Sequence, residues 1–259
     1  PTFEEYPNRV EESRRVIFTP SAENGFRYGA KDLIDFFTAN PVSNLIIVNP
    51  DNPSGNFMSL KDVKKLCTWC HKTGVRLLID ESFADFADKP YTLLTREFLA
   101  KYPNLSVMKS ISKSYGVPGA RLGVYASART GAVDLIKRNL SIWNINSFGE
   151  FFLQIIEKYL KEYRVGCGKL AAERNRFIKE LRQFKWLTVY PSAANYVLCR
   201  VDKPYTPQKL MMKLWTGHQI LIKDCSHKKA FGGAPFIRLA VRDEKDNDAL
   251  VAALKELTV

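Results

Sequence analysis

The 259-residue sequence is poor in several features that mark particular protein classes. Its five cysteines are odd in number and scattered, which is typical of reduced thiols rather than of a disulfide framework. No stretch approaches the roughly 18 consecutive apolar residues of a membrane helix, and no signal peptide is visible. Internal repeats and low-complexity tracts are also missing. These absences argue against a membrane protein and predict a cytoplasmic one.

The formal net charge of +12 raises the question of nucleic-acid binding. The basic residues are spread along the chain, and between Lys158 and Arg182 they alternate with glutamates. This alternation is typical of a solvated helix face. A nucleic-acid surface requires clustered charge and a recognition motif, so we expect no nucleic-acid partner.

The segment Cys67–His71 reads Cys-Thr-Trp-Cys-His, which matches the attachment string of a c-type haem. Val63, Leu66, Cys67 and Cys70 are spaced i, i+3, i+4 and i+7, so they share one face of a helix. That helix begins with a capping pattern at Ser59 and ends near Gly74. We therefore predict core-facing cysteines, and without further ligands at suitable spacing we expect no metal site.

Polar residues stand at the ends of successive apolar runs in the first half of the chain. Leu45–Val48 leads into the turn Asn49–Gly55, and Val75–Ile79 leads into Asp80. A third short strand precedes the Ser/Gly-rich turn that carries Lys113. Alternating strands and helices up to about residue 125 predict a mostly parallel sheet. Ligands bind beyond the carboxyl ends of such strands, so these polar residues would converge on one crevice.

Lys113 has two interpretations when its segment is considered alone. An exposed lysine is protonated, and only a desolvated or cation-flanked lysine loses its proton readily enough to attack an aldehyde. A solvated loop lysine is the simpler alternative for such a turn. The neighbouring strand ends shift the balance towards a Schiff-base lysine.

The set of motifs resembles the fold-type I pyridoxal phosphate enzymes, specifically the class I/II aminotransferases of the histidinol-phosphate aminotransferase and threonine-phosphate decarboxylase kind. The resemblance runs from Pro1–Tyr6 to the strand Phe236–Val241. It implies an α/β fold, with a three-layer, mostly parallel sheet in a cofactor-binding large domain at residues 1–147. Linking helices and a smaller C-terminal α/β domain would occupy residues 148–259. Long helices are expected from Phe148 to Phe184, with a break near Gly166–Gly168.

The resemblance starts well inside the family's large domain, and Pro1 is no translation start. Roughly the first third of a usual member would be missing, including the loop and helix N-terminus that hold the cofactor phosphate. Helix N-termini are strong anion sites, so we expect weakened cofactor binding and an inactive or impaired chain.

The resemblance assigns cofactor-binding roles to four residues. Lys113 would hold pyridoxal 5'-phosphate as an internal aldimine and then act as general acid and base. Asp80 would keep the pyridine nitrogen protonated, which makes the ring an electron sink. Asn52 would donate to the phenolic oxygen, and Phe3 would stack on the ring. On the residues alone, Asp80 could also be a loop or capping carboxylate, Asn52 a turn former and Phe3 a core side chain.

Anion-binding roles follow from the same resemblance. Ser110 and Arg121, with a contribution from Ser112, would hold the cofactor phosphate. Arg238 would bind the substrate α-carboxylate, and its apolar neighbours predict a buried arginine that needs an anion; a surface cation on an edge strand is the alternative. Lys223 stands where histidinol-phosphate enzymes have an arginine for the substrate phosphate, and lysine meets a phosphate only as a point charge.

The function implied is transfer of an amino group from an amino acid to a keto acid, with a phosphorylated substrate compatible with Lys223. A decarboxylase of the threonine-phosphate type shares every motif. Phe83 departs from the aminotransferase pattern, which has a tyrosine there to donate to the phenolic oxygen. A noncatalytic domain of a larger polypeptide is the third alternative. The family's shared active sites imply a homodimer.

Overall fold

A computed structural model describes residues 2–257, so Pro1, where the resemblance begins, lies outside the described residues. The first sheet contains the strands β1 (Asn44–Val48), β2 (Arg76–Asp80), β3 (Leu105–Ser110) and β4 (Gly123–Ser127), in that order. β1, β2 and β3 are parallel, and β4 is antiparallel to β3. The register aligns Val48 with Asp80 and Asp80 with Met108. The carboxyl ends of three strands therefore meet at one edge, as predicted.

The sheet is held by side chains that the strands and helices share. Burial alternates along β3, and Leu77 and Ile79 of β2 are almost fully buried. The covering helices are α2 (Ala30–Ala39), α3 (Leu60–Thr73) and α4 (Arg96–Lys101). Residues from α2 and α3 join the strands in one apolar cluster. The mixed α/β class with a parallel-rich sheet is confirmed.

The helix α3 forms where its sequence pattern predicts it. The Ser59 hydroxyl accepts a hydrogen bond from the Asp62 backbone N–H at 3.1 Å, and the helix ends at Gly74, whose φ of 74° suits a residue without Cβ. Cys67 and Cys70 are fully buried in the apolar cluster. The core-facing interpretation of these cysteines is confirmed.

Burial makes both thiols unreactive, which gives a first prediction. It raises the pKa of Cys67 and of Cys70 to about 12, and for Cys67 the neighbouring Cys70 adds to this. Iodoacetamide at pH 8 is expected to label neither thiol in the folded protein and both in urea, as peptide mass spectrometry would measure. Because unfolded thiols ionise near pH 8.5, the stability contributed by these groups falls as pH rises from about 9 towards 12. Rapid labelling without denaturant would contradict this.

The chain between the two sheets is helical. It contains α6 (Thr130–Asn139), α7 (Ser147–Ile155), the 3₁₀ turn η4 (Ile156–Tyr159) and α8 (Leu160–Leu181). The expected break near Gly166–Gly168 is wrong, because α8 continues through both glycines and the interruption falls at η4. A glycine costs about 1 kcal/mol in a helix, which the packing of the second half of α8 outweighs.

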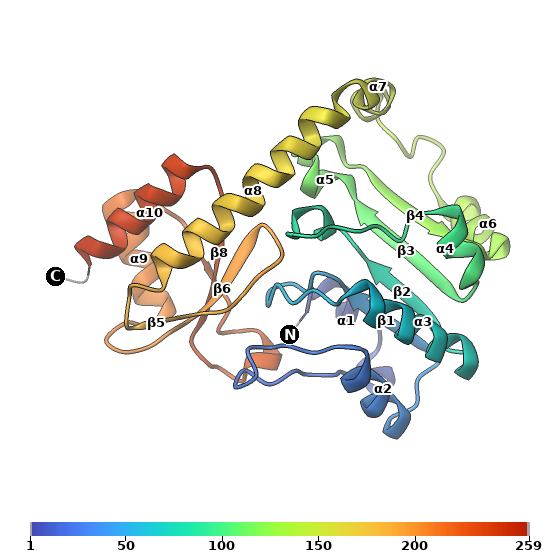
Figure 1. The fold of residues 1–259 in the computed structure, drawn as a ribbon, viewed down its shortest axis with the longest axis horizontal. Coiled ribbons are helices and arrows are strands. Elements are labelled where there is room, and N and C mark those ends of the chain that lie inside the picture. Colours follow the sequence, from blue (N-terminus) through green and yellow to red (C-terminus); the bar gives the residue numbers. More distant parts are fainter. Residues whose placement is uncertain (1, 258–259) are drawn as a thin grey trace.

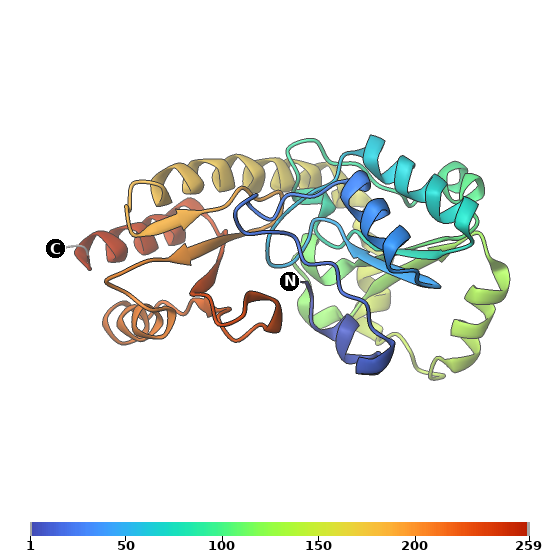
Figure 2. The same ribbon diagram turned by 90° about the horizontal axis from the view of Figure 1, so that it is seen from below.

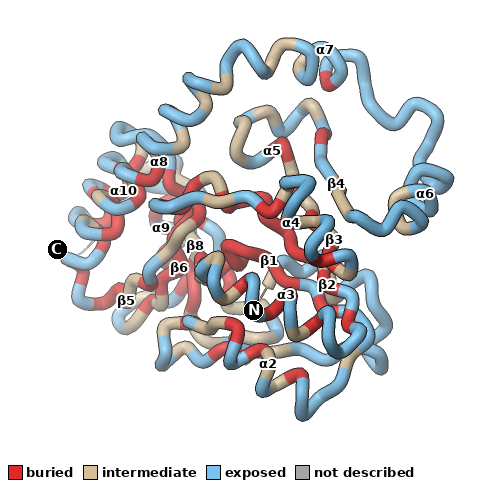
Figure 3. The backbone as a smooth tube through the Cα atoms, turned by 45° about the vertical axis from the view of Figure 1, so that its right-hand side comes forward, coloured by how far each residue is buried: buried red, intermediate tan, exposed pale blue. Residues whose placement is uncertain are grey.

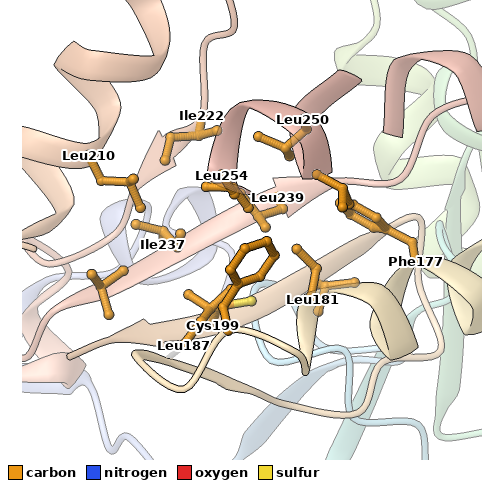
Figure 4. Packing of buried hydrophobic residues seen from close by; sticks show 14 of the residues in the cluster. Phe177, Leu181, Leu187, Cys199, Leu210, Ile222, Ile237, Leu239, Leu250 and Leu254 are labelled. Carbon is orange, nitrogen blue, oxygen red and sulfur yellow. The ribbon is translucent and has the colours of Figure 1, made fainter. Parts of the chain in front are cut away.

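The second sheet is antiparallel, with the order β5 (Leu187–Val189), β6 (Tyr196–Val201), β8 (Phe236–Ala240) and β7 (Lys223–Asp224). The helices α9 (Pro207–His218) and α10 (Glu244–Glu256) pack with α8 on this sheet. Figure 4 shows Phe177 and Leu181 of α8 together with Leu250 and Leu254 of α10 in the apolar cluster that also contains side chains of the strands. This core is separate from that of the first sheet.

Short helices complete the described chain: α1 (Glu5–Asn8), η1 (Glu12–Arg14), η2 (Ala84–Phe86), α5 (Ile111–Ser114), η3 (Pro118–Ala120) and η5 (Lys229–Phe231).

The helix α8 joins the two halves of the molecule. Figures 1 and 2 show it running from the side of the first sheet across to the second, with the N-terminal segment between them. In Figure 3 the part of the chain around α6 and α7 is almost entirely exposed. Among residues 2–257, no helix has both the length and the apolar character that crossing a membrane requires.

Candidate active site

Asp80 ends β2 as a buried carboxylate with three hydrogen bonds. Oδ2 accepts from the Tyr6 hydroxyl at 2.6 Å, and Oδ1 accepts from the Ser82 backbone N–H at 2.9 Å and from the Ser82 hydroxyl. Burial, and then the nearby Asp80 carboxylate, raise the pKa of Tyr6, so its hydroxyl stays protonated and donates. These bonds fix the orientation of the Asp80 carboxylate. The Ser82 bonds also give Asp80 a role in forming the loop, which was the alternative interpretation of its sequence position.

Ser82 connects this carboxylate to the strand that precedes Lys113. Its hydroxyl oxygen accepts a hydrogen bond from the Ser110 backbone N–H at 2.8 Å. Neither Ser82 nor Tyr6 was predicted as a site residue. The signal for Ser82 was its place two residues after Asp80, where a serine can close a local turn.

Lys113 lies on α5, the single helical turn that follows β3. Ile111 and Ser112 of this turn are buried, whereas Lys113 is exposed. The Ile111 N–H donates to the Leu122 carbonyl at 3.1 Å, which ties the turn to the start of β4. The desolvation invoked for a reactive lysine is therefore not provided by packing within residues 2–257.

Lys109, four residues earlier on β3, differs sharply from Lys113. It is buried, and its ammonium lies 2.7 Å from a carboxylate oxygen of Asp85. An amine held in this way is not free to attack a carbonyl. Burial and pairing thus distinguish two lysines that the sequence places in similar surroundings.

Arg238, in the middle of β8, contacts residues of the first half of the chain. Its guanidinium donates to Oδ1 of the buried Asn52 at 2.7 Å and lies 5.0 Å from the centre of the Tyr196 ring. The Tyr196 hydroxyl in turn donates to the Asp51 carbonyl at 2.9 Å. The sequence predicted a buried arginine, but Arg238 is only half-buried. Its guanidinium contacts a neutral amide and a ring face rather than an anion.

Lys223 stands directly opposite Arg238 in the β7–β8 pairing and is exposed. Residues opposite each other in an antiparallel pair point to the same face of the sheet. Two cationic side chains thus share one face.

Phe83 is buried with its ring edge against Tyr196, at a centroid distance of 5.1 Å.

The remaining predicted residues surround these groups. Arg121 is exposed, takes a left-handed φ of 54° and donates to the Pro118 carbonyl at 3.0 Å. Ser110 is half-buried and Ser112 is buried beside Lys113. Phe3 is 42% exposed and packs edge-on against Tyr6, so it is not a core side chain.

The family model for class I and II aminotransferases matches residues 1–254. The chain belongs to this family. A relative, the CMP-5'-(3-aminopropyl)phosphonate synthase of Streptomyces rubellomurinus, is 32% identical over 99% of this chain and 40% of its own length. The L-serine phosphate decarboxylase of Sulfurospirillum multivorans is 30% identical over 99% of this chain and 66% of its own length. The chain thus spans two thirds or less of both relatives.

A solved structure supports the same assignment. The histidinol-phosphate aminotransferase from Clostridium acetobutylicum superposes with a TM-score of 0.79 at 28% identity, covering 90% of this chain and 68% of that one. The predicted family and fold are both confirmed. The cofactor of class I and II aminotransferases is pyridoxal 5'-phosphate.

The donor set present in the chain suits this cofactor. The buried carboxylate of Asp80, the amide of Asn52 and an exposed primary amine at Lys113 follow three parallel strands. Exposed and half-buried cations, Arg121 and Arg238, complement a phosphate and a carboxylate. In residues 2–257 no cluster of histidine, cysteine, aspartate or glutamate side chains could hold a metal ion.

Proposed function

We propose that the protein uses pyridoxal phosphate to break a bond at Cα of an amino acid that carries a second anionic group. The observation that carries this proposal is the link from Asp80 through the Ser82 hydroxyl to the Ser110 N–H, three residues before Lys113. It joins the carboxylate that suits a pyridinium nitrogen to the turn that supplies an amine.

The bound cofactor supplies an electron sink for the pair of electrons left at Cα. Lys113 provides the amine and carries a proton to and from the reacting carbon. Asp80, oriented by Tyr6, accepts from the ring nitrogen. The Asn52 amide keeps its N–H donors for the phenolic oxygen, because its oxygen already accepts from Arg238.

Binding of the remaining groups is assigned to neighbouring residues. Phe3 offers a partly exposed ring face to the cofactor ring. Ser110, Ser112 and Arg121 would bind the cofactor phosphate at the turn next to Lys113. Their proximity in sequence and the tie between Ile111 and Leu122 support this assignment.

Arg238 and Lys223 are assigned to the substrate. Both lie on one face of the second sheet, opposite each other. Two adjacent cations suit a substrate with both a carboxylate and a phosphate or phosphonate. The names of the relatives from Streptomyces and Sulfurospirillum, a phosphonate synthase and a phosphoserine enzyme, support this substrate class.

Decarboxylation is the reaction that we favour. The L-serine phosphate decarboxylase matches over 99% of this chain, and Phe83 lacks the hydroxyl of the aminotransferase pattern. Transamination, the reaction predicted from the sequence, is the second candidate, and the similarity to the Clostridium histidinol-phosphate aminotransferase supports it. The choice depends on which bond at Cα lies perpendicular to the cofactor ring.

Product analysis distinguishes the two reactions. The purified chain, supplied with pyridoxal phosphate, is incubated with O-phospho-L-serine, O-phospho-L-threonine or L-serine, with and without 2-oxoglutarate. We expect carbon dioxide and a phosphorylated amine without an added keto acid, and little turnover of L-serine. Formation of glutamate only when 2-oxoglutarate is present would establish transamination instead. Neither product, together with no visible absorbance from bound cofactor, would support the noncatalytic alternative and overturn the proposal.

Three observations support proposals on the organisation of the protein. Ile142 and Trp143, between α6 and α7, and Phe148, on α7, are exposed large apolar side chains suited to an interface, which supports a homodimer. The sheet β1–β4 precedes residue 147 and the sheet β5–β8 follows it, which supports the division into domains 1–147 and 148–259. The unpaired cysteines support a cytoplasmic location.

A further inference from the structure

A buried polar cluster lies behind the turn that carries Lys113. The Lys109 ammonium contacts both carboxylate oxygens of Asp85, at 2.7 and 2.8 Å. The Tyr163 hydroxyl donates to Oδ2 of the same carboxylate at 2.6 Å. The side chains of Lys109 and Asp85 are only 9% and 20% exposed. Asp85 thus accepts from two donors that belong to different parts of the fold.

The three residues come from elements that have no sequence proximity. Lys109 is on β3, Asp85 is on η2 in the loop that follows Asp80, and Tyr163 is on α8. The cluster therefore fixes the long helix against both strands whose ends carry the proposed catalytic groups. Arg174, also on α8, reinforces this by donating to the Phe86 carbonyl.

A second contact joins α8 directly to the lysine turn. The Tyr163 ring stacks on the Tyr115 ring at a centroid distance of 4.0 Å and an interplanar angle of 4°. Tyr115 caps α5, and its N–H donates to the Ile111 carbonyl at 3.3 Å. Tyr163 consequently contacts Tyr115, at the end of the Lys113 turn, and Asp85, the partner of Lys109.

We propose that Lys109, Asp85 and Tyr163 are positioning residues that hold the Lys113 turn against α8. This inference rests on the proposed function of Lys113. A buried ion pair contributes little net stability relative to apolar packing, so a positional role explains its presence better than a stabilising one. Lys109 acts through its contacts and is not a second attacking amine.

The test uses Tyr163→Phe, which removes the donor and keeps the ring stack and the ion pair. Tyr159→Phe is the matched control, because Tyr159 lies one turn earlier and is 53% exposed. Hydrogen exchange of the Ile111 and Tyr115 amides reports on the turn without any cofactor. Borohydride trapping of pyridoxal phosphate at Lys113, quantified by peptide mass spectrometry, gives a rate constant and an apparent Kd.

We expect faster exchange at Ile111 and Tyr115 in Tyr163→Phe, and a trapping rate constant lower by about tenfold, with an unchanged apparent Kd. Tyr159→Phe should match the wild type in both measurements. Lys109→Arg, which keeps a cation opposite Asp85, should preserve the wild-type exchange.

Unchanged exchange at the turn in Tyr163→Phe would overturn the positional role, even if its denaturation midpoint fell. If exchange at the turn increases in Tyr163→Phe but the wild type is never labelled by pyridoxal phosphate at Lys113, the positional role is supported and the proposed function is overturned. The two inferences can thus fail independently.

Discussion

Replacing Lys113 with alanine is expected to abolish covalent attachment of pyridoxal phosphate and to reduce turnover by about a thousandfold or more. In the proposed mechanism, the variant loses both the amine and the group that moves the proton at Cα. Lys109 cannot take over, because its ammonium is buried and paired with Asp85. Visible absorbance of the purified protein, borohydride trapping and product formation measure the effect.

Two comparison variants sharpen this prediction. Lys113→Arg keeps the positive charge but offers no free amine, so it should fail like the alanine variant. Lys137→Ala changes an exposed lysine on α6 and should behave like the wild type. Trapped cofactor on Lys113→Ala at the wild-type level would show that another amine performs the reaction, and the assignment would be wrong.

Replacing Arg174 with alanine is expected to lower the free energy of unfolding by about 3–5 kcal/mol. The side chain is fully buried on α8. Its Nη1 donates to the carbonyls of Phe86 and Ala194, and its Nη2 lies 2.8 Å from a carboxylate oxygen of Asp88. Alanine leaves two carbonyls without this donor and opens a cavity, and each unsatisfied buried group costs about 1–3 kcal/mol.

Urea unfolding followed by circular dichroism tests the Arg174 prediction. Arg176→Ala is the control, because Arg176 lies two residues further along the same helix, is partly exposed, and pairs with the exposed Asp248 as well as with Glu173. Exposed pairs contribute about 1 kcal/mol or less. If Arg174→Ala lost as little stability as the control, the contacts of Arg174 with η2 and with the loop before β6 would not hold the two halves together.

The strands and the ends that carry chemistry could be predicted from the sequence. Apolar runs such as Leu77–Ile79 are local signals, and Asp80 does end its strand. The helix around Cys67 and Cys70 followed from spacing and a capping serine. Glycines were a poorer guide, because those at Gly166 and Gly168 lie in a helix held by contacts that no local pattern reveals.

The partners of the site residues could not be predicted. Tyr6 and Asp80 are separated by 74 positions, and Asn52 and Arg238 by 186, so no periodicity connects them. Lys109 and Lys113 look alike in the sequence, and only the fold buries Lys109 and pairs it with Asp85. The burial of Arg238 was overestimated. The apolar alternation around it reports only on its own strand and carries no signal for the amide and the ring that contact it.

With Asn52 and Arg238 in their proposed roles, the hydrogen bond between them links cofactor binding to substrate binding thermodynamically. An anion that draws the guanidinium away releases the Asn52 oxygen and frees the amide to turn, which changes how well it donates to a cofactor. Linkage is reciprocal, so the cofactor must alter the affinity for the anion by the same factor. One amide, shared between the sheets, would thus let the enzyme sense whether its substrate is present.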